Sequence, residues 1–141
     1  MQPSGQLFDE VIACYREQFS FVLQDLLNPP TEQQPILVEG NSLLPDCVVE
    51  VLSETSRAVW LIPTETFQRK MYRRRGDWVE NILAECNAPG LAYEHWMARD
   101  AAFARWIKAR TTSLNLPLLE VSGQQSIAEN ADRVAKRLGL K

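Results

Sequence analysis

Ala58-Val59-Trp60-Leu61-Ile62-Pro63-Thr64 is the stretch that decides the fold of this chain. Its first five residues are apolar without alternation, which is typical of a strand buried on both faces of a parallel sheet. Thr64 is suited to cap a helix that runs through Phe67 toward Tyr72, because its hydroxyl can accept a hydrogen bond from a backbone N–H of the first turn. The stretch therefore predicts a buried strand that leads directly into a helix.

Two similar apolar runs lie on either side of this stretch. Ile36-Leu37-Val38 comes before it and residues 117–121 come after it, and both predict further buried strands. Most of the remaining chain shows either the helical spacing of apolar residues or residues typical of a helix N-terminus. The expected helices are residues 6–27, 44–52, 78–86, 91–112 and a last one that begins with the capping box Ser126-Ile127-Ala128-Glu129. In that last helix we expect a buried stripe of Ile127, Ala131, Val134, Ala135 and Leu138, and a left-handed cap at Gly139.

The order of these elements predicts an α/β fold. Strands that alternate with helices favour right-handed parallel crossovers, so we expect a short parallel sheet with helices on both faces, in three layers. No linker, repeat or low-complexity tract divides the chain, and residues 1–141 are expected to form a single domain.

Composition excludes several classes of protein. The formal charge of −3 gives no general attraction to nucleic acid or to an anionic membrane. No apolar run reaches the roughly 20 residues that a spanning helix needs, and the N-terminus lacks a secretory pattern, so we expect a cytoplasmic protein. The three cysteines are an odd number and widely spaced, so the sequence suggests neither a disulfide framework nor a zinc site. The single histidine, His95, has no nucleophile motif around it, so we expect a structural or solvated histidine rather than a catalytic one.

Glu39-Gly40 is the first candidate site. A carboxylate directly after a buried parallel strand lies where α/β sheets bind ligands, and there it could hold a hydrated magnesium ion. A solvated turn residue is the alternative interpretation.

The basic run from Arg69 to Arg75 is the second candidate. It could be a solvated helix end, since cations suit a helix C-terminus. The adjacent Arg73, Arg74 and Arg75 could also clamp a phosphoryl group, because guanidinium binds phosphate oxygens through two donors at once. RNA binding is a third interpretation, but aromatic residues for base stacking are not clustered with the arginines, and we expect no nucleic-acid partner.

Arg99-Asp100 is the third candidate. Asp100 falls on the apolar face of the helix expected at residues 91–112, where an ionised carboxylate is costly unless it is paired. We expect the partner to come from Arg73, Arg74 or Arg75. The pair is then either a structural link between two helices or part of an arginine lid over a phosphate site.

The loop Ser122-Gly123-Gln124-Gln125 is the fourth candidate. Gly123 permits tight backbone geometry, and the polar backbone groups around it could edge a base or a ribose. By itself the loop is no more than a helix entry.

Taken together, these pieces resemble the small P-loop kinases, the group around adenylate, shikimate and nucleoside kinases. The resemblance runs from about Gly5 onward and rests on the order and spacing of five segments rather than on any single motif. These segments are Ile36-Leu37-Val38-Glu39-Gly40, residues 58–64, the arginine run ending at Arg75, Trp96-Met97-Ala98-Arg99-Asp100, and the last strand with its loop and capped helix.

The resemblance implies an ATP-dependent phosphotransferase acting on an unknown small-molecule acceptor. Glu39 would take the magnesium-side position, Arg73, Arg74, Arg75 and Arg99 would face the transferred phosphoryl group, and Gly123 and Gln124 would lie beside the adenine. Catalysis in such enzymes is mostly positioning and electrostatic stabilisation.

This chain departs from the family in two connected respects. The motif G-x-x-x-x-G-K-[ST] does not occur in its sequence, and neither does the central strand that precedes that loop in the family. The chain would then be truncated, or shortened so that its strands at 36–38 and 58–62 pair directly, or completed by a second chain. We expect weak or no kinase activity and a homo-oligomer. The alternative is a non-catalytic interaction domain that uses the helix at residues 6–27.

Overall fold

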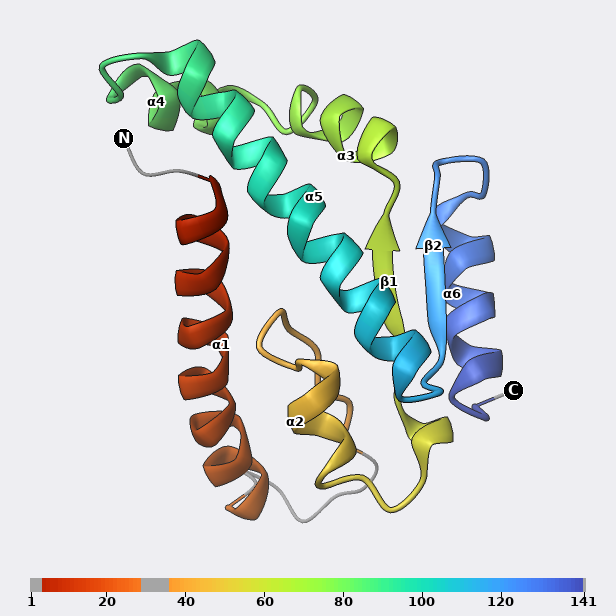
Figure 1. Cartoon of the computed structure of the whole chain (residues 1–141). Coiled ribbons are helices and arrows are strands. Elements are labelled where there is room, and N and C mark those ends of the chain that lie inside the picture. Colours follow the sequence, from red (N-terminus) through yellow and green to blue (C-terminus); the bar gives the residue numbers. More distant parts are fainter. Residues whose placement is uncertain (1–3, 29–35, 141) are drawn as a thin grey trace.

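The computed structural model describes residues 4–28 and 36–140 (Figure 1). It is mostly helical, with a parallel sheet of two strands against which helices pack. In chain order the elements are α1 (Ser4–Leu27), α2 (Pro45–Val49), the 3-10 turn η1 (Thr55–Arg57), β1 (Trp60–Pro63), α3 (Glu65–Tyr72), α4 (Asp77–Ala84), α5 (Pro89–Ser113), β2 (Leu118–Val121) and α6 (Ile127–Arg137). At this level the predicted mixed α/β class is confirmed.

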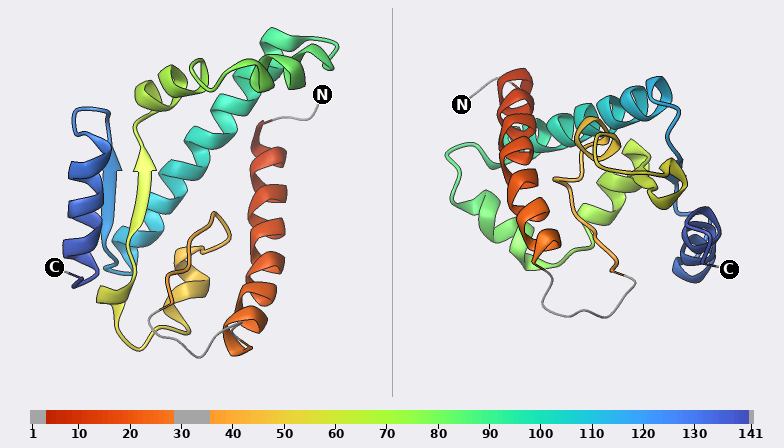
Figure 2. Two further views of the ribbon diagram at one scale, coloured as in Figure 1. Left: turned by 180° about the vertical axis from the view of Figure 1, so that it is seen from behind. Right: turned by 90° about the horizontal axis from the view of Figure 1, so that it is seen from below.

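The sheet joins β1 to β2 in parallel, with Trp60 opposite Leu118 and Pro63 opposite Val121. Because side chains alternate along a strand, Glu120 and Leu119 point to opposite faces. The Nζ of Lys108 on α5 lies 2.9 Å from the Glu120 carboxylate, so α5 covers the face of the sheet to which Glu120 points. On the other face Leu119 is buried, and α6 runs beside β2 (Figures 1 and 2). Leu61, next to Leu119 on that face, remains 47% exposed.

The strand predicted at Ile36-Leu37-Val38 is wrong. Residues 36–40 form neither strand nor helix, and the three apolar side chains are 39%, 79% and 37% exposed. A run of three residues makes a strand only where a neighbouring strand satisfies its backbone, since β propensity depends on context. In the described chain β1 pairs with β2 alone, so direct pairing of the two predicted strands is also wrong.

The core lies between α1, α2, the sheet and the C-terminal half of α5. Its buried residues are Phe19, Leu44, Val48, Trp60, Ile62, Ile107 and Leu116. Aromatic pairs join α1 to α5, with Tyr15 meeting Phe103 at a ring-centroid distance of 5.6 Å. Asp46 of α2 adds ion pairs to Arg16 of α1 and Arg110 of α5. The apolar stripe of α1 is thus largely covered by the chain's own helix α5.

The C-terminal helix α6 has the predicted ends but not the predicted burial. Ser126 and Glu129 form the capping box, and Gly139 adopts a φ of +67° in the C-terminal cap. The N–H of Leu140 donates to the carbonyl of Ala135, as expected for a Schellman motif. However, Ile127 is 91% exposed and Ala131 is also exposed, so the buried stripe is wrong at these two positions. Val134, Ala135 and Leu138 are half-buried.

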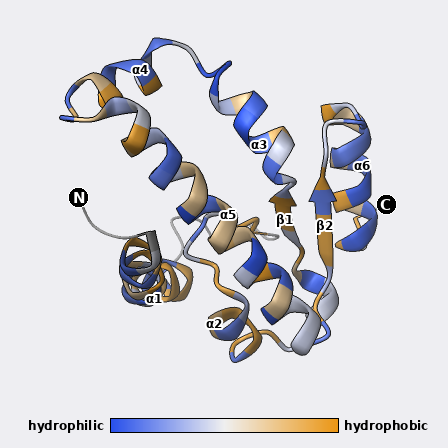
Figure 3. Cartoon of the chain, turned by 45° about the horizontal axis from the view of Figure 1, so that its top comes forward, coloured by the Kyte–Doolittle hydropathy of each residue, from blue (hydrophilic) through white to orange (hydrophobic). Residues whose placement is uncertain are grey.

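The helices α3, α4 and the N-terminal half of α5 extend beyond the end of the sheet. Figure 1 shows α3 continuing from β1, α4 at the far end, and α5 returning past both toward β2. Figure 3 shows β1 in the hydrophobic colour and most of α3 in the hydrophilic colour, because α3 contains Glu65, Gln68 and the start of the basic run, Arg69 and Lys70. No helix in the described part of the chain is long and apolar enough to cross a membrane.

Candidate functional site

An aromatic cluster joins α3, α4 and α5 at this far end. The Tyr72 ring meets the Trp96 ring edge-on with centroids 5.3 Å apart, and Trp96 meets Trp78 at 5.9 Å. Each of the three rings comes from a different helix, so the cluster holds the three helices together.

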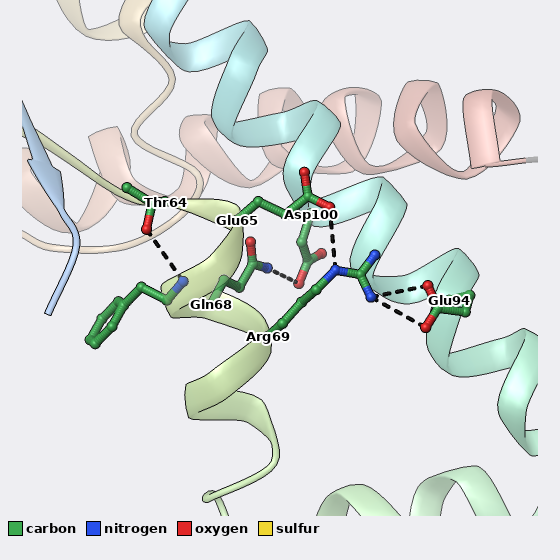
Figure 4. Close-up of polar contacts among 7 residues, drawn as sticks. Thr64, Glu65, Gln68, Arg69, Glu94 and Asp100 are labelled. Carbon is green, nitrogen blue, oxygen red and sulfur yellow. Dashed lines mark hydrogen bonds and ion pairs between the residues drawn. The ribbon is translucent and has the colours of Figure 1, made fainter.

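Asp100 lies beside this cluster and is saturated with hydrogen bonds. Its Oδ1 accepts from Arg99 Nε at 2.8 Å and from Arg99 Nη2 at 2.6 Å. Its Oδ2 accepts from the Gln68 amide at 3.1 Å and from the Tyr72 hydroxyl at 3.0 Å. Figure 4 shows Gln68 reaching from α3 to Asp100 on α5. The expected pairing of Asp100 is confirmed, but the expected partner is wrong.

The partner of Asp100 is Arg99, its own neighbour, rather than Arg73, Arg74 or Arg75. The reason lies in the geometry of α3. Gln68 and Tyr72 are four residues apart on one helix face, and that face points at Asp100. The three arginines follow after the last turn of α3 and are exposed.

Arg75 nevertheless returns to the same cluster. Its guanidinium lies over the Tyr72 ring, 4.6 Å from the centroid, in cation–π geometry. Burial of the Tyr72 phenol raises its pKa, the Asp100 carboxylate raises it further, and the nearby Arg75 and Arg99 act in the opposite direction. The structure therefore brings Arg75 and Arg99 together around Tyr72. The expectation that no aromatic residues cluster with the arginines is wrong, because the Tyr72 ring under Arg75 belongs to the aromatic cluster with Trp96 and Trp78.

A second set of contacts fixes α3 against α5. Arg69 donates from Nη1 to both carboxylate oxygens of Glu94, at 3.2 and 3.0 Å, and from Nε to Glu65 at 3.3 Å (Figure 4). Thr64 caps α3 as predicted, accepting from the Phe67 N–H at 3.3 Å. The basic run is thus divided, since Arg69 is structural and Arg75 stacks on the aromatic cluster.

Arg73 and Arg74 take part in neither the Arg69–Glu94 contact nor the stacking of Arg75 on Tyr72. Arg74 is exposed and makes no side-chain hydrogen bond or ion pair with the described residues. Arg73 borders an open hollow of about 340 Å³ between the end of α3, α4 and the start of α5. Tyr72 forms one wall of this hollow and Tyr93 another.

The other predicted site residues do not join the arginines. Glu39 is exposed on the segment that does not form a strand, and no group of three potential metal ligands occurs in the described part of the chain. Gly123 has a φ of +83°, and a Cβ built there would lie 2.5 Å from the Phe67 ring. The loop that contains Gly123 and the exposed Gln124 therefore contacts the first turn of α3. Arg75 follows the last turn of the same helix, about 12 Å along its axis, so the loop and Arg75 lie at opposite ends of α3.

Sequence reasoning missed Tyr72, Gln68 and Tyr93. For the first two a signal was present, because residues four apart on a helix share a face, and a buried carboxylate needs donors opposite it. Tyr93 carries no such signal, since its position depends on how α4 turns back onto α5.

No known protein family, curated protein or solved structure matches this chain.

Proposed function

We propose that this chain is a kinase-type phosphotransferase relative that binds phosphate groups of a small molecule through Arg75 and Arg99. One observation carries the proposal: Arg75 from the connection after α3 and Arg99 from α5 converge on one tyrosine–carboxylate pair. The finer fold proposed with it is the three-layer arrangement of a P-loop nucleoside triphosphate hydrolase. Its support is the order of the four matching segments from residue 58 onward, since residues 36–40 do not form the strand that the resemblance implies.

The chemistry of the two guanidinium groups suits an anionic ligand. Arg75 is held by an aromatic ring rather than by a carboxylate, so its N–H donors remain available. Arg99 uses Nε and Nη2 on Asp100, which leaves Nη1 for a second acceptor. Asp100 offsets one of the two charges, and the cluster is left with a net charge of about +1 toward solvent.

ATP with magnesium is the ligand that the resemblance implies, and the described residues fit it only in part. Arg75 and Arg99 suit its phosphate groups. Glu39 belongs to no group of three potential metal ligands among the described residues, and the sequence contains no G-x-x-x-x-G-K-[ST] loop. We therefore expect Mg-ATP to bind weakly and derive no phosphoryl-transfer step through it.

Calorimetry with sodium tripolyphosphate and with Mg-ATP tests the proposal. We expect dissociation constants of about 0.1–1 mM (roughly −5 kcal/mol), weakened about tenfold by Arg75→Ala. Arg105→Ala is the matched control, because Arg105 is an exposed arginine on α5 that makes none of the contacts described above for Tyr72, Arg99 and Asp100. Equal losses in both variants would show only general charge attraction. Micromolar Mg-ATP binding that survives Arg75→Ala would place the phosphate site elsewhere.

A second candidate function is a non-catalytic interaction or oligomerisation domain. The observation that favours it is the exposure of large apolar residues, including Leu27 at 80% and Leu37 at 79%. The central stripe of α1 does not contribute, because it packs on α5.

A further inference from the structure

The hollow between α3, α4 and α5 has an apolar lining with a few polar groups around it. Val79, Leu83 and Pro89 supply the apolar surface. Arg73, Glu80 and Tyr93 supply one cation, one anion and one phenol. Its volume of about 340 Å³ lies near the lower end of small-molecule sites, which are mostly apolar with a small number of placed polar groups.

The two charged residues of the hollow are unused by the fold. Neither Arg73 nor Glu80 forms an ion pair or side-chain hydrogen bond with another described residue. Close by, Arg69 is paired with Glu94 and Arg99 with Asp100. A free cation and a free anion on the rim of one apolar hollow therefore offer a ligand two charge-assisted contacts of opposite sign.

Tyr93 gives an independent indication. Its hydroxyl is shielded from solvent and has no hydrogen-bond partner among the described residues, although the residue lines the hollow. A buried hydroxyl without a hydrogen-bond partner carries a cost in the free energy of folding, because it has lost its contacts with water. A ligand in the hollow that offers a polar atom would remove this cost.

We propose that the hollow binds a small zwitterion with an apolar side chain, that is, a free α-amino acid. Its carboxylate pairs with Arg73, its ammonium group with Glu80, and its side chain lies on Val79 and Leu83. Tyr93 contributes a hydrogen bond. This site needs no phosphate, so it stands independently of the function proposed for Arg75 and Arg99.

The test is calorimetry of the full chain with L-phenylalanine, 2-phenylethylamine, which lacks the carboxylate, and 3-phenylpropanoate, which lacks the ammonium group. We expect saturable binding of L-phenylalanine with a dissociation constant of about 1 mM or below, and at least tenfold weaker binding of the other two. Arg73→Ala and Glu80→Gln should each weaken L-phenylalanine about tenfold. Arg105→Ala and Glu85→Gln, both at exposed positions outside the hollow, should not.

Tyr93→Phe separates binding from folding. It removes only the unpaired hydroxyl, so the melting temperature of the ligand-free protein should stay the same or rise while L-phenylalanine binding weakens. The proposal is overturned if L-phenylalanine does not bind at about 10 mM, a concentration well above the expected dissociation constant. It is also overturned if 3-phenylpropanoate binds equally well, or if the control variants lose as much affinity as Arg73→Ala.

Discussion

At the scale of single residues, Asp100 organises the far end of the molecule. Four hydrogen bonds from Arg99, Gln68 and Tyr72 meet on its two oxygens. Gln68 is buried, and its amide depends on Asp100 for its side-chain hydrogen bond. The carboxylate therefore fixes the α3–α5 contact and sets the orientation of the ring on which Arg75 stacks.

Asp100→Ala should lower the free energy of unfolding by about 2–3 kcal/mol. The substitution leaves the buried Gln68 amide and the Tyr72 hydroxyl without their acceptor, and unsatisfied buried donors are costly. Urea denaturation measures the change. Asp9→Ala, at an exposed position of α1, is the control and should change stability by less than about 0.5 kcal/mol. A similarly small change at Asp100 would mean that the network contributes nothing to stability.

Tyr72 should make stability decline in alkaline solution. Its pKa is raised in the folded protein, first by burial and then by Asp100, so the folded state holds the phenolic proton more tightly than the unfolded chain does. The stability that this proton contributes is complete below the unfolded pKa of about 10 and is lost as pH rises through the folded value.

Denaturation curves of the wild type and Tyr72→Phe between about pH 8 and pH 11 check this expectation. The difference in unfolding free energy between the two proteins should be constant at lower pH and shrink above about pH 10. A difference that stays constant to pH 11 would show that Tyr72 ionises equally easily in both states.

At the scale of elements, the sequence predicts best what is decided locally. The caps at Thr64 and Ser126 and the helix α5 appear as expected, because capping hydrogen bonds and helical periodicity involve neighbours along the chain. The strand at residues 36–38, the partner of Asp100 and the burial of Ile127 were predicted wrongly. Each of these depends on which distant segment lies opposite, which a pattern of residue types does not contain.

Within α6, Ile127 and Val134 should respond differently to truncation. Ile127 is 91% exposed, so Ile127→Ala should change the free energy of unfolding by less than about 0.5 kcal/mol. Val134 is half-buried, and Val134→Ala should cost about 1 kcal/mol. Thermal or urea denaturation of the two variants compares them within one helix. A larger loss for Ile127→Ala would mean that its side chain is covered in solution, for example by a second copy.

At the scale of the whole molecule, the sheet has an open edge. The N–H of Trp60 donates to Pro117, directly before β2, and the N–H of Thr64 donates to Val121 of β2. The N–H of Leu61 therefore points away from β2. Pro63 has no N–H, and a proline on an edge strand discourages the addition of a further strand. Association is therefore expected to use exposed apolar side chains more than backbone pairing.

We predict that the chain is a homodimer or a larger homo-oligomer at micromolar concentration. Two-fold dimers are the commonest way to cover an apolar surface with a copy of itself, and Leu37 on the segment without a strand is 79% exposed. Light scattering after size exclusion measures the mass of the wild type and of Leu37→Asp, which should be monomeric with an unchanged melt because Leu37 supports no core contact. Ile127→Asp adds the same charge to a distant helix and should remain associated. A wild type that is monomeric and melts cooperatively would show instead that two strands and their helices suffice for a stable fold, and the exposed residues 36–38 would then need no partner.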